Sequence, residues 1–485
     1  MHISGMLSSR YLRLGLIGIL VATCACFASL SRGQAGAGAV SGVSAQTPDI
    51  PPLSADDVSI LFPGPTRAED LANLIAVRDL TAQNVQDPTK RDLVWPYEVF
   101  QQFLAIAASP AGQVAGTQNQ IGLPPEAQSM DAWFIAGIRI DAGAPGLSDD
   151  IRAQFGQRPE IRLIIQPVTR KPDGTPQVLD FAGHLIFDFI LDKQASAPAG
   201  CPPPGLAQPD PDAFSSIVAD VAALRTKLAN GQLGTNKVIT AGLPLGVHPG
   251  LADATTAVNL RQEIKSFLER HISGQHLNAM ALAGLSAGKP APWIFLAMIN
   301  IHPGVIPAFP NGKVIPLNGP TLDGVQFAQM LQPDTIFPRV VPQPTTNNLN
   351  PITCQSAAVS ATSLPISSRS GVSTSVLLAA APPPSLAPDK IQGILDVIDD
   401  PAKSHFFNTD CVSCHTETTA AMDLLHAKTI PGVDTAVLPN GPWDVRNFGW
   451  KGSHATVTRR TAEETAAVVA FINSHLLVKP AAPNH

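Results

Sequence analysis

The chain has 485 residues, of which 45% are hydrophobic and only 14% are charged, and its formal net charge is −6. Such a composition supplies enough apolar side chains for two or three folded domains and excludes wholesale disorder. It offers no basic field, so the sequence predicts no nucleic-acid partner. The 46 prolines favour turns and extended segments over a bundle of long helices.

Residues 1–37 have the pattern of a secretory signal peptide. Arg10 and Arg13 precede an apolar run that ends among small residues. A membrane anchor is the alternative, but the apolar run is only just long enough to cross a bilayer and a tract of Gly, Ala and Ser follows it. Residues 21–24 (VATC) also approach a lipobox, which leaves a lipid anchor on Cys24 open. We expect an exported protein, periplasmic or secreted, with no transmembrane span after the signal is removed.

Residues 46–354 are predicted to form a large α+β domain. Apolar residues recur at helical spacing in 67–78, 97–108, 211–233 and 258–272. Runs rich in Ile, Val and Phe predict strands at 133–140, 160–168, 178–191 and 292–301, with a hairpin turn at 171–174 (KPDG). No nucleotide-binding or hydrolase motif occurs in this region. We therefore expect it to dock a partner or to bind a ligand.

Two cysteines, Cys201 and Cys354, remain once the signal peptide and the C-terminal pair Cys411 and Cys414 are set aside. In an exported protein such a pair predicts a disulfide, and two unpaired buried thiols are the alternative. The segment 355–387 is rich in Ser, Ala, Thr and Pro. That composition is typical of an interdomain linker.

The run Cys411-Val412-Ser413-Cys414-His415 has the spacing needed for covalent haem attachment. Two thiols at this spacing can bond the two vinyl groups of haem, and the adjacent imidazole can ligate the iron. A redox CxxC pair, half of a zinc site and a small-loop disulfide are the competing interpretations. A redox pair would need a βαβ context and a zinc site would need two further ligands close by, and the sequence shows neither. We therefore predict one covalent haem c, held by Cys411, Cys414 and His415.

Residues 388–480 resemble a class I c-type cytochrome. The run 406–416 (FFNTDCVSCHT) looks like the haem-attachment segment of that family. An amphipathic helix from Pro388 precedes it, and a helix that opens at 461–464 (TAEE) follows it. The resemblance implies a small all-α haem domain that exchanges electrons with a redox partner protein.

The sixth iron ligand departs from the usual methionine of that family. Met422 is the only methionine after the motif, and it lies too few residues past His415 to reach the other side of the haem. His454 lies in the loop where the resembling family places its distal ligand, so we predict it as the sixth ligand. The alternatives are an iron without a strong sixth ligand or one of three other histidines, namely His405, His426 and His475.

Arg459 and Arg460 stand just before the last predicted helix, where positive charge is unfavourable. This position is compatible with a partner, either a haem propionate or a protein surface, and an ordinary solvated pair of charges is the alternative. The predicted function of the whole chain is that of an exported monohaem cytochrome in electron transfer. The alternatives are a haem-dependent oxidoreductase whose substrate binds to residues 46–354, or a redox-sensing binding protein.

Overall fold

The computed structural model describes thirteen parts of the chain, namely residues 52–84, 87–109, 121–144, 146–149, 152, 157–191, 208–285, 293–301, 313–316, 325–327, 387–403, 411–441 and 444–477. Several predicted features lie outside these residues: the signal peptide, Cys24, Cys201, Cys354, His405 and residues 355–386. The predictions made for them stay predictions.

The described residues include a nine-stranded sheet in which every pairing is antiparallel. Its main path runs in the order β1 (Ser59–Leu61), β4 (Trp133–Ala144), β5 (Arg158–Arg170), β7 (Ala182–Asp188), β8 (Leu277–Leu285), β9 (Trp293–Ile301) and β10 (Lys313–Pro316). Beside this path, β6 (Pro176–Val178) pairs with β5 and β11 (Val325–Phe327) pairs with β9. A separate two-stranded ladder joins β2 (Thr81–Gln83) to β3 (Arg91–Leu93).

The predicted hairpin turn at 171–174 is confirmed and connects β5 to β6. Gly174 has φ +83°, which only glycine adopts readily, and the Asp173 carboxylate accepts the N–H of Thr175 at 2.9 Å. Both residues act locally, so the turn could be predicted from the sequence.

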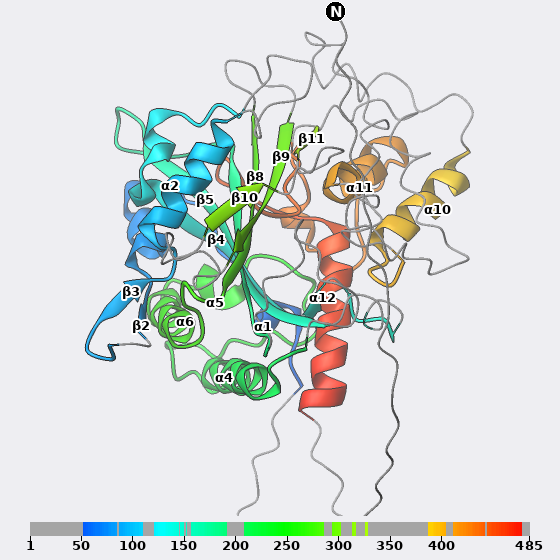
Figure 1. Ribbon diagram of the computed structural model, residues 1–485. Helices are drawn as coiled ribbons and strands as arrows, with labels where there is room; N and C mark the ends of the chain where they lie inside the picture. The colour runs from blue at the N-terminus through cyan, green and yellow to red at the C-terminus, as the bar shows by residue number, and fades with distance from the viewer. Residues whose placement is uncertain are drawn as a thin grey trace, which may run out of the picture. The chain divides into compact units, whose positions relative to one another are not determined.

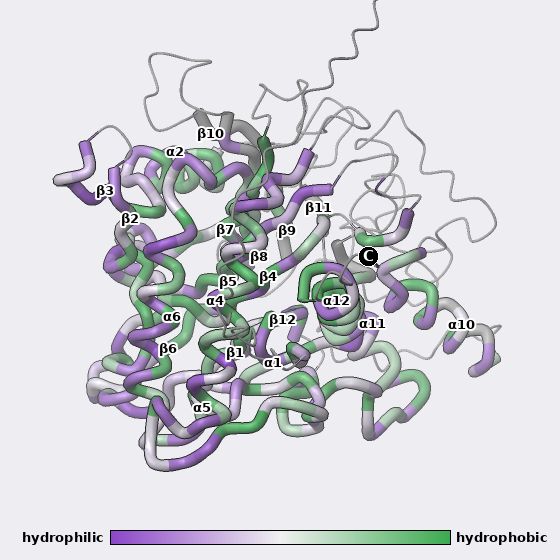
Figure 2. Tube along the Cα trace, turned by 90° about the horizontal axis from the view of Figure 1, so that it is seen from below, coloured by the Kyte–Doolittle hydropathy of each residue, from purple (hydrophilic) through white to green (hydrophobic). Residues whose placement is uncertain are grey.

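Three amphipathic helices lie on one side of the strands (Figures 1 and 2): α2 (Tyr97–Ala107), α4 (Pro211–Ala229) and α6 (Ala257–His271). Hydrophobic and hydrophilic residues alternate along α2 in Figure 2, as expected for a helix with one buried face. Its Phe103 packs edge-on against Trp133 of β4, with 6.0 Å between ring centroids. All three helices were predicted from the sequence, and α4 begins where Asp210 caps it and Pro211 occupies the first turn.

The helix predicted at 67–78 is wrong in type. The chain forms two 3₁₀ segments there, η1 (Ala68–Asn73) and η2 (Val77–Asp79). Between them Ala76 forms a β-bridge with Phe134 at the edge of the sheet. A short isolated helix has little stability of its own, so this pairing with the sheet decides the local conformation.

The C-terminal part of the chain packs on the other side of the strands (Figure 1). It consists of α10 (Pro388–Asp399), α11 (Cys411–Leu424), η8 (Thr435–Val437), β12 (Phe448–Lys451), β13 (His454–Val457), α12 (Arg459–Phe471) and η9 (Ile472–Leu476). Trp450 of β12 is fully buried, and its Nε1–H donates to the backbone oxygen of Phe62 at 2.8 Å. Trp450 and Val457 belong to the same hydrophobic core as Leu163 of β5. The described residues on either side of the Ser-, Ala- and Pro-rich segment 355–387 therefore share one hydrophobic core.

The α+β class predicted from the sequence is confirmed, but residues 388–480 are not all-α, because β12 and β13 form an antiparallel hairpin. The reason is local: Gly452 (φ +59°) begins the two-residue turn between Lys451 and His454, a turn type that requires positive φ. The last helix also begins earlier than predicted. Thr458 is its N-cap and accepts the N–H of Thr461 through its side chain.

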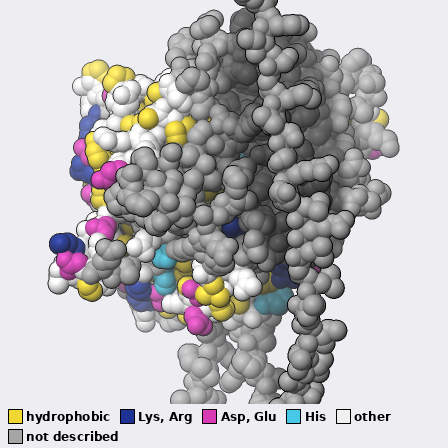
Figure 3. All heavy atoms as spheres, in the orientation of Figure 1, with side chains coloured by type: hydrophobic (Ala, Val, Ile, Leu, Met, Phe, Trp, Pro, Cys, Tyr) yellow, Lys and Arg dark blue, Asp and Glu magenta, His cyan; other side chains and the backbone are white. Residues whose placement is uncertain are grey.

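No described helix is both long and apolar enough to cross a membrane. On the described part of the face in Figure 3, Lys and Arg side chains lie next to Asp and Glu side chains. That mixture agrees with the absence of a basic field in the composition.

Candidate haem-attachment site

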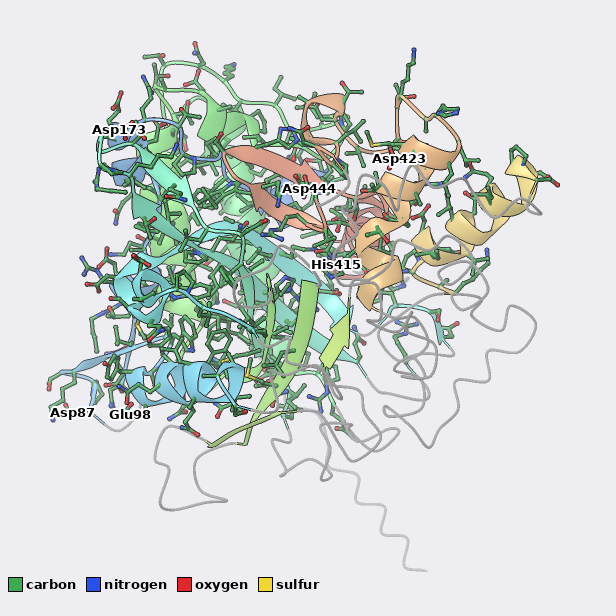
Figure 4. The ribbon with its side chains drawn as sticks, turned by 90° about the horizontal axis from the view of Figure 1, so that it is seen from above. Asp87, Glu98, Asp173, His415, Asp423 and Asp444 are labelled. Carbon is green, nitrogen blue, oxygen red and sulfur yellow. The ribbon has the colours of Figure 1, made fainter. Side chains whose placement is uncertain are left out.

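The CxxCH motif stands at the beginning of α11, which starts at Cys411. Positions 411, 414 and 415 therefore share one face of a helix, because residues three and four apart are neighbours on a helix surface. Cys414 and His415 are both half-buried. Figure 4 shows His415 on the side of α11 that faces the strands, with Asp444 nearby at the base of the β12–β13 hairpin.

A backbone carbonyl holds the His415 ring. The Nδ1 atom of His415 lies 2.7 Å from the oxygen of Val445, and a carbonyl can only accept, so Nδ1 carries the proton. The lone pair then resides on Nε2. Burial, only partly opposed by this hydrogen bond, lowers the pKa of His415 to about 4, so the ring is neutral near pH 7. A neutral imidazole with its second nitrogen bonded to a carbonyl is the form in which histidine binds metals.

A buried network fixes the loop that carries Val445. The Asp444 carboxylate accepts from the Thr456 hydroxyl at 2.6 Å and from the N–H of Arg446 at 3.2 Å. The guanidinium of Arg446 bonds to Asp180 at 2.7 Å and to the oxygen of Trp450 at 3.1 Å. These contacts tie the Val445 carbonyl to both the hairpin and the sheet.

The hairpin itself is pinned to the sheet by close contacts. Gln166 of β5 accepts the N–H of Trp450 at 2.5 Å and donates to its oxygen at 2.9 Å. A Cβ added at Gly137 of β4 would lie 2.5 Å from the ring of Phe448, so only glycine admits this ring. The site therefore rests on a rigid support that depends on particular side chains.

The helix α11 is also bonded directly to the start of α12. Glu417 accepts the N–H of Arg460 at 2.9 Å, and Thr418 accepts the N–H of Arg459 at 2.8 Å. A carboxylate at a helix N-terminus stabilises its unpaired N–H groups. The residues just after the CxxCH motif are thereby fixed against the last helix.

The side chains of the two arginines are paired with protein groups. Arg459 lies 2.8 Å from Asp396 and 3.0 Å from Asp399, while Arg460 lies 2.7 Å from Glu464. Both arginines therefore pair with carboxylates of this chain, and the predicted propionate or protein-surface partner stays a prediction.

Charges concentrate where α12 meets the sheet. Burial alone would raise the pKa of Glu464, but the guanidinium groups of Arg460, Arg139 and Arg162 lower it to about 2. Glu464 lies 2.8 Å from Arg139, which points from β4 toward the same helix. This carboxylate is thus ionised at every physiological pH.

The other predicted ligands lie in different settings. His454 is half-buried on β13, and its Nε2 lies 2.8 Å from the oxygen of Leu438. His426 is exposed, with φ +55°, just beyond the end of α11. His475 is exposed and stacks on Phe471, with 4.5 Å between centroids. Met422 packs against the hydrophobic core.

Sequence reasoning did not select His184, a half-buried histidine of β7 that pairs in register with Ile164 of β5. The only signal in the sequence was a histidine within a run of Leu, Ile and Phe. That signal does not show which residues lie near His184 until the pairing of the strands is known. Among the described side chains, no group of three or more His, Cys, Asp or Glu residues converges on a common metal position.

No family profile, curated protein or solved structure matches this chain. The proposals below therefore rest on the chemistry of the site.

Proposed function

We propose that this chain is an exported monohaem c-type cytochrome that transfers electrons. Cys411 and Cys414 would hold one haem c covalently, and His415 would ligate its iron. The hydrogen bond from His415 Nδ1 to the Val445 oxygen carries the proposal, because it fixes the tautomer that presents Nε2 for coordination. The attachment motif itself supports haem over other cofactors.

Haem c supplies one-electron chemistry between ferric and ferrous iron. The residues of this chain then have three tasks. The Val445 carbonyl orients His415, and the network of Asp444 and Arg446 holds that carbonyl in place. Trp450 is fully buried beneath this loop. Such close packing would limit the movement of the loop when the iron gains or loses an electron.

The sheet region is proposed to dock a redox partner protein or to bind a ligand, in the periplasm or outside the cell. Reduction of the haem by a small molecule alone would favour the alternative of a haem-dependent oxidoreductase. Reduction only by other redox proteins would favour the electron carrier.

The test is a pyridine haemochrome spectrum of the full chain matured in a host with cytochrome c assembly. We expect one haem per chain that stays attached in acidified acetone. A colourless protein, or haem that the solvent extracts, would contradict the proposal. In that case zinc content and thiol titration of the same sample would distinguish a zinc site from a redox pair.

A further inference from the structure

His184 is an unexplained imidazole in the middle of the sheet. In the register of β7 it lies opposite Ile164 of β5 and opposite Ala281 of β8. Its neighbours Leu185 and Phe187 point to the other face and are fully buried, whereas His184 is half-buried. Neither a hydrogen bond nor an ion pair joins the His184 ring to any described residue. A polar ring in such a position usually has a partner.

The segment that holds His415 covers the same face of the sheet. A Cβ added at Gly449 of β12 would lie 3.5 Å from Ile164, the cross-strand neighbour of His184. Directly paired residues of adjacent strands project from one face, about 5 Å apart. The hairpin therefore lies one strand away from His184.

A second contact ties this segment to the approach of β7. Arg446 binds Asp180, which lies two residues before that strand, at 2.7 Å. The adjacent Val445 is the residue that orients His415. The two histidines are therefore on the same side of the sheet and close to the same loop.

The surroundings of His184 are also suited to a large flat group. Its neighbours on β8 along this face are Ala279 and Ala281, both small and half-buried, and Ile186 on β7 is half-buried as well. By contrast, side chains of the opposite face on the same strands, such as Met280 and Leu282, are fully buried. Among the described residues of β7 and β8, the side chains on the face of His184 are therefore more exposed than those on the opposite face.

We propose that His184 would supply a second protein ligand to the haem iron, in addition to His415. This inference rests on the proposed function, since it requires a haem at Cys411 and Cys414. It makes the sheet region part of the haem site, with one ligand from residues 46–354 and one from the CxxCH motif. It also replaces His454, whose Nε2 already meets the Leu438 oxygen.

The test compares holoproteins with single substitutions by optical and electron paramagnetic resonance spectroscopy. The wild type is expected to be low-spin and closed to carbon monoxide. His184→Gln should become high-spin and bind carbon monoxide, while the matched control His454→Gln should remain low-spin. A low-spin His184→Gln spectrum, or a wild type that is already high-spin, would overturn the inference.

A second variant guards against misfolding. His184→Met should restore a low-spin spectrum with a methionine–iron charge-transfer band and a raised reduction potential. An unchanged bis-histidine spectrum in this variant would count against His184 even if His184→Gln failed to fold. If the wild type carries covalent haem but substitutions of His184 leave its spectrum unchanged, this inference is refuted and the proposed function stands. Absence of covalent haem would refute the proposed function.

Discussion

The two faces of the sheet are built on different principles. On the face toward α2, α4 and α6, the strands present large apolar side chains such as Ile138, Leu163 and Leu185, all fully buried. The face toward α11 and α12 instead presents Arg139, Gln166 and His184, together with small residues.

Interactions that depend on particular atoms are concentrated on the face toward α11 and α12. Apolar burial is non-directional and accepts many side chains of similar volume. The polar face depends on particular atoms: Gln166 bonds both backbone groups of Trp450, and Glu464 pairs with Arg139. The face toward α11 and α12, whose side chains bond to particular partners, is the face on which we propose that the haem lies.

The largest expected effect is loss of the cofactor from the polar face. Cys414→Ala removes one of the two attachment thiols, so the amount of covalently bound haem per chain should fall well below that of the wild type. The measurement is haem stain intensity per mole of protein after denaturing electrophoresis. Met422→Leu conserves volume and serves as the control, which should keep full staining. Equal staining of both variants would remove Cys414 from the attachment site.

The next largest effect tests whether the two faces fold together. Trp450→Ala should lower the free energy of unfolding by about 3–5 kcal/mol, because a fully buried Trp is replaced by a cavity. Leu163→Ala on the apolar face should cost about 2–5 kcal/mol. Urea denaturation should show a single transition in both variants, shifted in each. Two transitions, of which each variant shifts only one, would indicate independent domains.

A smaller effect concerns acid and the ion pairs of the polar face. The folded pKa of Glu464, about 2, lies below the ordinary value of 4.5, so its contribution is present above pH 4.5 and is lost as the pH falls toward 2. We expect this loss to be about 2 kcal/mol in the wild type, allowing for partial exposure of the pair.

The measurement is urea denaturation of the wild type and Glu464→Gln at pH 6 and pH 3. The variant should be less stable at pH 6, and the difference should shrink at pH 3. Glu463→Gln, one residue away with its side chain 40% exposed, is the control and should follow the wild type. Parallel pH curves for Glu464→Gln and the wild type would contradict the role assigned to the Arg139–Glu464 pair.

The smallest expected effect is that of cutting the chain between residues 355 and 387. Residues 444–477 share the core of the sheet, so a specific protease site inserted in this segment should yield two fragments that stay together. Gel filtration in native buffer should give one peak, and addition of 6 M urea should separate it into two. A haem-bearing fragment of roughly 100 residues that elutes alone in native buffer would show that the shared core does not hold the parts together.

Much of the fold could be predicted because its signals are local. Helical periodicity located α2, α4 and α6, strand composition located β4, β5 and β9, and Gly174 with Asp173 identified the β5–β6 turn. The short apolar run of β8 was missed because periodicity alone does not distinguish it from a loop or a helix end. The β12–β13 hairpin was missed because its residues were interpreted by their side-chain chemistry, although Gly452 carried a turn signal.

The prediction of haem attachment needed only the sequence, since the CxxCH motif consists of five consecutive residues. The tertiary structure alone shows which carbonyl bonds to His415 and which side of the sheet the motif faces. Val445 lies thirty residues from His415 along the chain, and His184 lies more than two hundred residues away. Strand pairing brings such residues together, and a shift of one residue in its register would turn His184 to the opposite face.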